Sequence, residues 1–134
     1  MAPGPKTPGI VVRAAHYPGR APIDAYGNGG FRFAGMSHRG SLLCLPSGIY
    51  GWEAPPPASI DEASLAKAFG EAEGIETLLV GTGREIVPLA ETLRGRLRDA
   101  RIVAEAMSTG AAVRTFNVLL AENRAVAAAL IAVD

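Results

Sequence analysis

The sequence has a single cysteine, no excess of either charge and no long apolar run. One cysteine cannot form an internal disulfide, which is typical of a protein in a reducing compartment. Its 13 basic and 13 acidic residues balance to a net charge of +0, which argues against a nucleic-acid-binding protein that works by positive charge. No run of roughly 18 or more apolar residues exists, so the sequence predicts no transmembrane helix.

Metal-binding and catalytic motifs are also missing. We expect the two histidines, His16 and His38, on loops, and no H-x-x-H or C-x-x-C pair exists. Cys44 lies in the apolar segment 42–45, where burial keeps a thiol protonated and inert. No serine occupies a G-x-S-x-G elbow. We therefore expect no metal, no cofactor and no catalytic residue, which favours a non-enzymatic protein.

Length and composition predict one domain. A chain of 134 residues that is 49% hydrophobic can form a stable core without a structural metal ion or a disulfide bond. Residues 1–9 are rich in proline and glycine, so we expect a disordered lead-in and then a single α/β domain over residues 10–134. The lead-in lacks the apolar stretch of a secretory signal, which favours a cytoplasmic protein.

The first half of the chain has the pattern of β structure. Apolar residues at every second position flank the dipeptide Asn28-Gly29, which supplies the positive φ angles of a tight hairpin turn. These apolar residues are Ile23, Ala25, Phe31 and Phe33. We expect the next turn at residues 37–40, a buried central strand at 41–45 and a short strand at 49–52.

In the second half, helical and strand patterns alternate. Ser59 and Glu62 have the spacing of a capping box and predict a helix that ends at Gly74. We expect strands at 77–80 and 102–104, separated by a helix that Pro88 opens. Ser108 or Thr109 caps a third helix. Residues 125–133 are apolar throughout and fit either a buried strand or a helix.

This order of elements predicts an α/β fold. Strands that alternate with helices form a mainly parallel sheet with the helices on its faces. The hairpins of the first half add antiparallel strands. The expected fold is a single three-layer domain with a mixed, mainly parallel central sheet and an added β-hairpin layer.

Two glycine-bearing strand exits form the candidate binding site. Gly81-Thr82-Gly83-Arg84 follows one expected strand and Ser108-Thr109-Gly110 follows the next, so both should lie at the same sheet edge. Arg84 and a helix N-terminus together provide groups that hold a carboxylate or a phosphate, so the alternative function is a small anionic-ligand binder or an enzyme that uses this crevice. The alternative is a tight strand exit where only glycine fits. The loop lacks the G-x-G-x-x-G and P-loop patterns.

Two further side chains are candidates for a supporting role. We expect Glu105 directly after a strand and before the capped helix, where it is either a general base or a partner of the helix dipole. Asn117 lies three residues after Arg114, so the two share a helix face. That face is either solvated, or Asn117 forms a buried hydrogen bond to a neighbouring strand.

Three stretches stand out together by their order and spacing. They are Asp24-Ala25-Tyr26-Gly27 before Phe31, residues 78–83, and residues 107–130, which begin Met107-Ser108-Thr109-Gly110. In these stretches the chain resembles a widespread family of small uncharacterised α/β proteins that includes mitochondrial respiratory complex I assembly factor 3. The matching positions are Gly81, Thr82, Gly83, Thr109, Asn117 and Glu122, whereas Phe116 stands where the family commonly has tyrosine.

The resemblance covers nearly all of the chain after the lead-in. It implies a compact three-layer α/β domain with a mixed sheet and an adaptor-like or chaperone-like protein without established catalytic residues. It also implies a protein partner and a function in the assembly of respiratory or other membrane complexes. Peripheral attachment to the inner membrane and the oligomeric state stay open.

Overall fold

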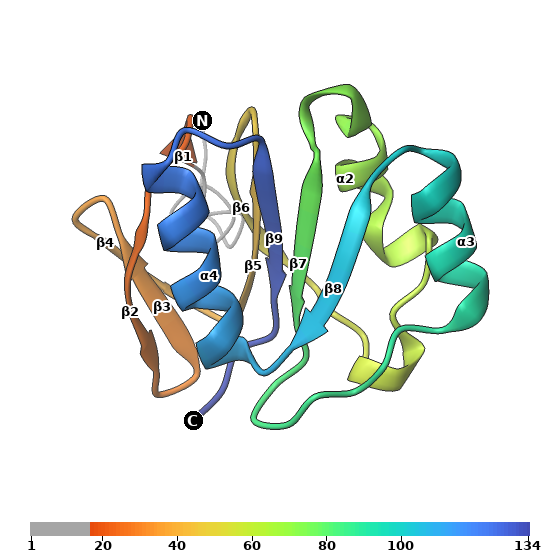
Figure 1. Cartoon of the computed structure of the whole chain (residues 1–134). Coiled ribbons are helices and arrows are strands. Elements are labelled where there is room, and N and C mark those ends of the chain that lie inside the picture. The colour runs from red at the N-terminus through yellow and green to blue at the C-terminus, as the bar shows by residue number, and fades with distance from the viewer. Residues whose placement is uncertain (1–16) are drawn as a thin grey trace, which may run out of the picture.

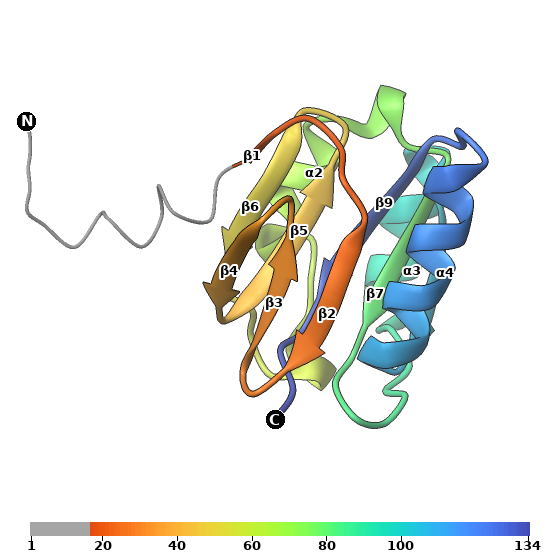
Figure 2. The same cartoon turned by 90° about the vertical axis from the view of Figure 1, so that its left-hand side faces the viewer.

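The structure is a computed structural model that describes residues 17–134. The lead-in predicted for residues 1–9 lies outside the described residues, as does His16, and the predicted start of the domain at residue 10 stays a prediction. Figures 1 and 2 show a central sheet with helices on both faces and a small second sheet beside α4.

The central sheet has six strands in the order β1-β6-β5-β9-β7-β8. Strands β9, β7 and β8 are parallel, and β5, β6 and β1 extend the sheet by antiparallel pairing, which makes it mixed as predicted. The chain end 125–133, which fitted either a strand or a helix, forms β9 between β5 and β7. The strands are β1 Tyr17–Pro18, β5 Ser41–Leu45, β6 Gly48–Trp52, β7 Thr77–Gly81, β8 Val103–Met107 and β9 Val126–Leu130.

The small sheet is antiparallel and consists of β2 (Ile23–Gly27), β3 (Gly30–Phe33) and β4 (Met36–Arg39). The turn predicted at Asn28-Gly29 is confirmed, since both residues have positive φ angles, 54° and 78°. The turn predicted at residues 37–40 is wrong.

The chain instead turns between β3 and β4 at Ala34 and Gly35, with φ angles of 50° and 76°. An alanine in the left-handed region gives no signal in the sequence, whereas Ser-His-Arg-Gly looks like a turn and forms a strand. His38 therefore lies buried in β4 and not on a loop.

A register shift in β2 changes which residues face the core. Ile23 pairs with Phe33, but the next paired residue is Ala25, opposite Arg32. This bulge inserts one extra residue between them and turns Ala25 to the outside. Ile23, Phe31 and Phe33 are buried as the alternation predicts, and Ala25 is exposed.

The single helix predicted from Ser59 to Gly74 is wrong, because residues 57–74 form four short turns of helix. Asp61 and Ser64 prevent the predicted capping box: the Ser64 N–H donates to Asp61 Oδ1 at 2.9 Å, and Asp61 N–H donates to Ser64 Oγ at 3.0 Å. The expected apolar face is nevertheless kept, since Leu65 is buried in the core. The turns are η2 Pro57–Ser59, η3 Ala63–Leu65, α2 Ala66–Phe69 and η4 Ala72–Gly74.

The two longer helices follow β7 and β8. Helix α3 spans Glu91–Asp99, so Pro88 precedes the helix rather than opening it. Helix α4 spans Thr109–Ala121, and Ser108 caps it, because its Oγ accepts from Ala111 N–H at 3.3 Å. The strand expected at 102–104 is β8, which runs on to Met107.

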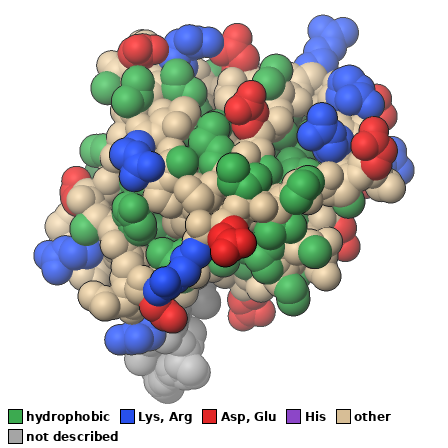
Figure 3. All heavy atoms as spheres, turned by 60° about the horizontal axis from the view of Figure 1, so that its bottom comes forward, with side chains coloured by type: hydrophobic (Ala, Val, Ile, Leu, Met, Phe, Trp, Pro, Cys, Tyr) green, Lys and Arg blue, Asp and Glu red, His purple; other side chains and the backbone are tan. Residues whose placement is uncertain are grey.

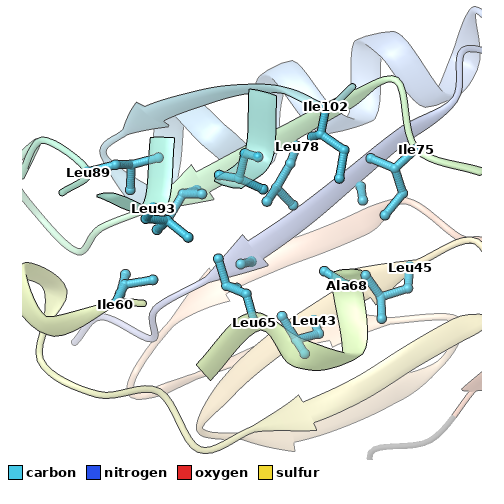
Figure 4. Packing of buried hydrophobic residues seen from close by; sticks show 14 of the residues in the cluster. Leu43, Leu45, Ile60, Leu65, Ala68, Ile75, Leu78, Leu89, Leu93 and Ile102 are labelled. Carbon is cyan, nitrogen blue, oxygen red and sulfur yellow. The ribbon is translucent and has the colours of Figure 1, made fainter. Parts of the chain in front are cut away.

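Two apolar clusters lie on opposite faces of the central sheet, which confirms the three-layer α/β fold. One cluster contains Leu65, Leu93 and Leu97 of the α2 and α3 layer (Figure 4). The other contains Phe33 of the small sheet and Phe116 of α4. Strand β9 is buried along its whole length between these two layers.

Candidate functional site

The carboxyl ends of the three parallel strands meet at one rim, which consists of residues 82–87, 108–110 and 131–134. Thr82 N–H donates to Met107 C=O at 2.8 Å, and Thr109 N–H donates to Gly83 C=O at 2.7 Å. Ile131 N–H donates to Gly81 C=O at 2.9 Å and ties β9 to the same place. The two glycine-bearing exits therefore lie side by side, as their positions in the sequence predict.

Two buried threonine hydroxyls hold the rim together. Thr109 Oγ1 accepts from Gly83 N–H at 3.0 Å and donates to Ile131 C=O at 2.7 Å. Thr82 Oγ1 donates to Glu85 C=O at 2.6 Å and accepts from Val87 N–H at 3.0 Å. Because these hydroxyls are occupied by backbone groups, Thr82 and Thr109 shape the rim rather than offering groups to a ligand.

The backbone geometry of the rim explains why glycine occupies positions 81 and 83. A Cβ at Gly81 would lie 2.9 Å from Thr109 Cα, so β7 passes too close to the start of α4 for any side chain. Gly83 has a φ of 110°, a conformation that residues with a side chain rarely adopt. The tight strand exit, which was the alternative to a ligand site, accounts for both glycines.

Beside this closed junction the rim has an open hollow of about 440 Å³. Tyr26 lies against Gly110, where a Cβ would collide with the tyrosine hydroxyl. Within residues 17–134, neither of the two arginines that line the hollow takes part in an ion pair. The lining residues are Tyr26, Gly83, Arg84, Ser108, Gly110, Arg114, Val133 and Asp134.

Figure 3 looks onto the rim. Apolar side chains gather in the middle of this face, with basic and acidic side chains among them. Ile86, in the rim loop after β7, is 64% exposed. The rim therefore combines charged groups of both signs with an apolar surface.

Sequence reasoning missed Tyr26 and Arg114 as residues of this hollow. Tyr26 belongs to the stretch Asp24-Ala25-Tyr26-Gly27, which carried the family resemblance, and β2 brings it to the start of α4. Arg114 lies four residues after Gly110 and so stands above it on the same helix face. The spacing of four residues between Gly110 and Arg114 is the signal in the sequence that indicates a place for Arg114 beside the hollow.

The two candidate supporting residues lie elsewhere. Asn117 accepts from Ile23 N–H at 2.9 Å and donates to Ile23 C=O at 2.8 Å, so it joins α4 to β2, as one of its two interpretations expected. Glu105 lies within β8 and not after it, and its side chain is exposed. The boundary was misplaced because the alternation of alanine with Val103 and Glu105 gives a weak strand signal.

Two buried titratable groups in the described part of the chain, Cys44 and His38, have pKa values shifted by burial. Burial raises the pKa of the Cys44 thiol to about 12, which keeps it protonated and unreactive. Burial lowers the pKa of His38, whose Nε2 lies 3.2 Å from Ser41 C=O. Among residues 17–134, no group of three His, Cys, Asp or Glu side chains is placed to hold a metal ion.

The fold and the rim define the class of this protein as a small three-layer α/β domain with a mixed sheet. Its rim is held by hydrogen bonds between two threonine hydroxyls and the backbone. The chain belongs to the family of proteins of unknown function DUF498/DUF598, whose model matches residues 23–131. The resemblance seen in the sequence motifs is thereby confirmed.

Relatives in this family include uncharacterised bacterial proteins and mitochondrial assembly factors. An uncharacterised protein of Rhodobacter capsulatus is 39% identical over 91% of this chain and 93% of its own length. The mouse NADH dehydrogenase [ubiquinone] 1 alpha subcomplex assembly factor 3 is 31% identical over 91% of this chain. The chain spans 66% of the mouse protein and 59% of its human counterpart.

Solved structures of similar chains have the same fold. A crystal structure of a Bartonella henselae protein, described as an outer membrane protein, is 61% identical, with a TM-score of 0.85 over 89% of this chain and 100% of that chain. A Bordetella pertussis protein described as an Mth938-like domain is 27% identical, with a TM-score of 0.73 over 98% of this chain and 92% of that chain. No helix among residues 17–134 is long and apolar enough to cross a bilayer.

Proposed function

We propose that this protein is a non-enzymatic interaction domain that assists the assembly of a respiratory or other membrane complex, working from the cytoplasmic side through a protein partner. The observation that carries the proposal is the similarity to the mouse NADH dehydrogenase assembly factor along 91% of the chain. The apolar side chains that gather in the middle of the rim face (Figure 3) support it, since contiguous exposed apolar patches mark contacts between proteins. Trp52 and Phe31, where an exposed patch would have supported it further, are buried.

Complementation tests this proposal. In Rhodobacter capsulatus cells that lack the 39% identical relative, we expect less assembled NADH dehydrogenase in the membrane, and expression of this chain restores the amount. The measurement is a native gel of solubilised membranes stained for NADH dehydrogenase activity. Normal amounts of the assembled complex in the deletion strain contradict the proposal.

We infer as a second candidate that the rim binds a small anionic ligand through the residues predicted from the sequence. Arg84 and Arg114 line one hollow beside Ser108 and the start of α4, and these groups favour negative charge, whereas the carboxylate of Asp134 in the same lining opposes it. Gly81, Thr82, Gly83 and Thr109 form the frame that holds them.

A thermal-shift measurement tests the anion site. Phosphate or a small dicarboxylate at 100 times its Kd raises the free energy of unfolding by about 2.7 kcal/mol. The increase disappears in Arg84→Ala and Arg114→Ala and persists in Arg98→Ala, a matched change on α3. An equal shift in all three variants, or no shift in the unaltered protein, contradicts the site.

A further inference from the structure

The open edge of β8 offers backbone groups to another chain. Among the described residues, β8 is the last strand of the central sheet and pairs only with β7 (Figure 1). Val103 N–H donates to Glu76 C=O at 2.9 Å, and Met107 C=O accepts from Thr82 N–H. Backbone groups of successive residues point to opposite sides of a strand. The amides and carbonyls of Ala104 and Ala106 therefore point away from β7, into the open edge.

On the α4 side of this edge, Val103 of β8 is 60% exposed. The buried face of α4 contains Ala112, Val113 and Phe116, so helix α4 covers the sheet behind the edge and leaves the Val103 side chain open to an added strand.

On the α3 side, a hollow of about 220 Å³ opens beside the same edge. Its apolar lining consists of Leu97, Ile102, Val103 and Ala104, and Arg94 and Arg98 stand at its border. Within residues 17–134, these two arginines have no ion pair, whereas Arg96 pairs with Glu62 at 3.2 Å. The hollow thus offers an apolar floor and two guanidinium groups without an acidic partner.

The charges beside the edge differ between its two faces. Glu105 is exposed in the middle of β8 and points to the same face as Val103, because side chains alternate along a strand. Arg94 and Arg98 lie on the other face. An added strand would therefore meet one carboxylate on the α4 face and two guanidinium groups on the α3 face.

We propose that β8 binds an extended segment of a protein partner as an additional strand, with a Lys or Arg of that segment opposite Glu105 and a neighbouring Asp or Glu facing Arg94 and Arg98. The proposal names the mode of binding for the interaction domain proposed above and rests on that function. Addition of a strand to an open sheet edge gives affinity through main-chain hydrogen bonds and specificity through the alternating side chains. Adjacent opposite charges in an extended segment match the two faces of the edge.

A second copy of this chain is a poorer occupant of the edge. Two β8 strands that pair antiparallel about Glu105 would place the two carboxylates opposite each other, and like charges in a cross-strand pair are destabilising. The same arrangement would bring Arg94 and Arg98 of one copy close to those of the other. The charge pattern therefore disfavours self-pairing of the edges and favours a partner of complementary charge.

The test uses blocked octapeptides of alternating valine and threonine, with lysine and glutamate at the two central positions, and measures binding by fluorescence anisotropy. Ala106→Pro removes an N–H that points into the edge, so the fold is kept. We expect binding to the unaltered protein and a loss of at least about tenfold in Ala106→Pro and in Glu105→Lys. The charge-matched control Glu53→Lys, remote from β8, binds like the unaltered protein.

Reversal of the charges on Glu105 and on the central residue of the peptide tests whether these two groups contact each other. A peptide with glutamate in place of the central lysine should bind Glu105→Lys better than it binds the unaltered protein. No binding by any peptide at millimolar concentration, or equal binding by Ala106→Pro, overturns the proposal. Self-association in analytical ultracentrifugation that Ala106→Pro abolishes also overturns it, because a second copy then occupies the edge.

The same variant separates this proposal from the proposed function. If the unaltered chain restores the membrane complex in the deletion strain and Ala106→Pro does not, both stand. If Ala106→Pro, present at the same level, restores the complex fully, the edge is not the binding site, although the assembly function stands. If the unaltered chain restores nothing, the assembly function fails, and the edge proposal then fails with it.

Discussion

Replacement of Thr109 by valine should lower the free energy of unfolding by about 2–4 kcal/mol. Valine fills nearly the same space as the buried Thr109 side chain, but it leaves Gly83 N–H without an acceptor and Ile131 C=O without a donor at the part-buried junction. An unsatisfied buried polar group costs about 1–3 kcal/mol. Urea denaturation followed by circular dichroism measures the change.

The conservative variant Thr109→Ser is the control for this prediction. Serine keeps the hydroxyl and loses one methyl group, so the expected cost is only about 1 kcal/mol. A valine variant as stable as the serine variant would contradict the view that the hydroxyl ties the ends of β7, β8 and β9 together.

Replacement of Asn117 by leucine should destabilise the protein by a similar amount, about 2–4 kcal/mol. The Asn117 amide accepts from Ile23 N–H and donates to Ile23 C=O, so it takes the place of a neighbouring strand along β2. Leucine removes both hydrogen bonds and also excludes the water that would replace them. Because α4 and β2 are joined here, the loss should concentrate in the small sheet.

Hydrogen exchange distinguishes this local effect from a general one. In Asn117→Leu, amides of β2, β3 and β4 should exchange faster, while those of β7 and β9 keep their protection until global unfolding. Arg114→Leu, one turn earlier on an exposed part of α4, is the matched control and should leave the small sheet unchanged. Uniformly faster exchange in all strands would contradict a specific junction between α4 and β2.

The alternation of elements in the second half could be predicted because each signal is local. Thr77–Gly81 is a short apolar run that glycine ends, and Ser108 caps α4 where the sequence places a cap. Parallel neighbours deliver their ends to one rim, so the meeting of Gly83 with Thr109 followed from topology alone. The family resemblance followed from residues in the same local stretches.

Some features could not be predicted, because competing local contacts or contacts between distant residues decide them. In the segment 59–74, Asp61 and Ser64 bond to each other, in competition with the capping box that Ser59 and Glu62 suggest. Ala34 adopts a positive φ that only the pairing of β3 with β4 explains. At the rim, Tyr26 is about 80 residues from Gly110 in the chain, and only the fold of the small sheet brings the two together.

The position of β9 has a consequence for how the protein is made. Strand β9 is the last strand of the described chain, yet it lies between β5 and β7 and is the only link between the two halves of the sheet. During synthesis, the antiparallel half and the β7-β8 pair have no common sheet until residue 130 has left the ribosome. The nascent chain therefore exposes two apolar strand edges until β9 has been synthesised and inserts between them.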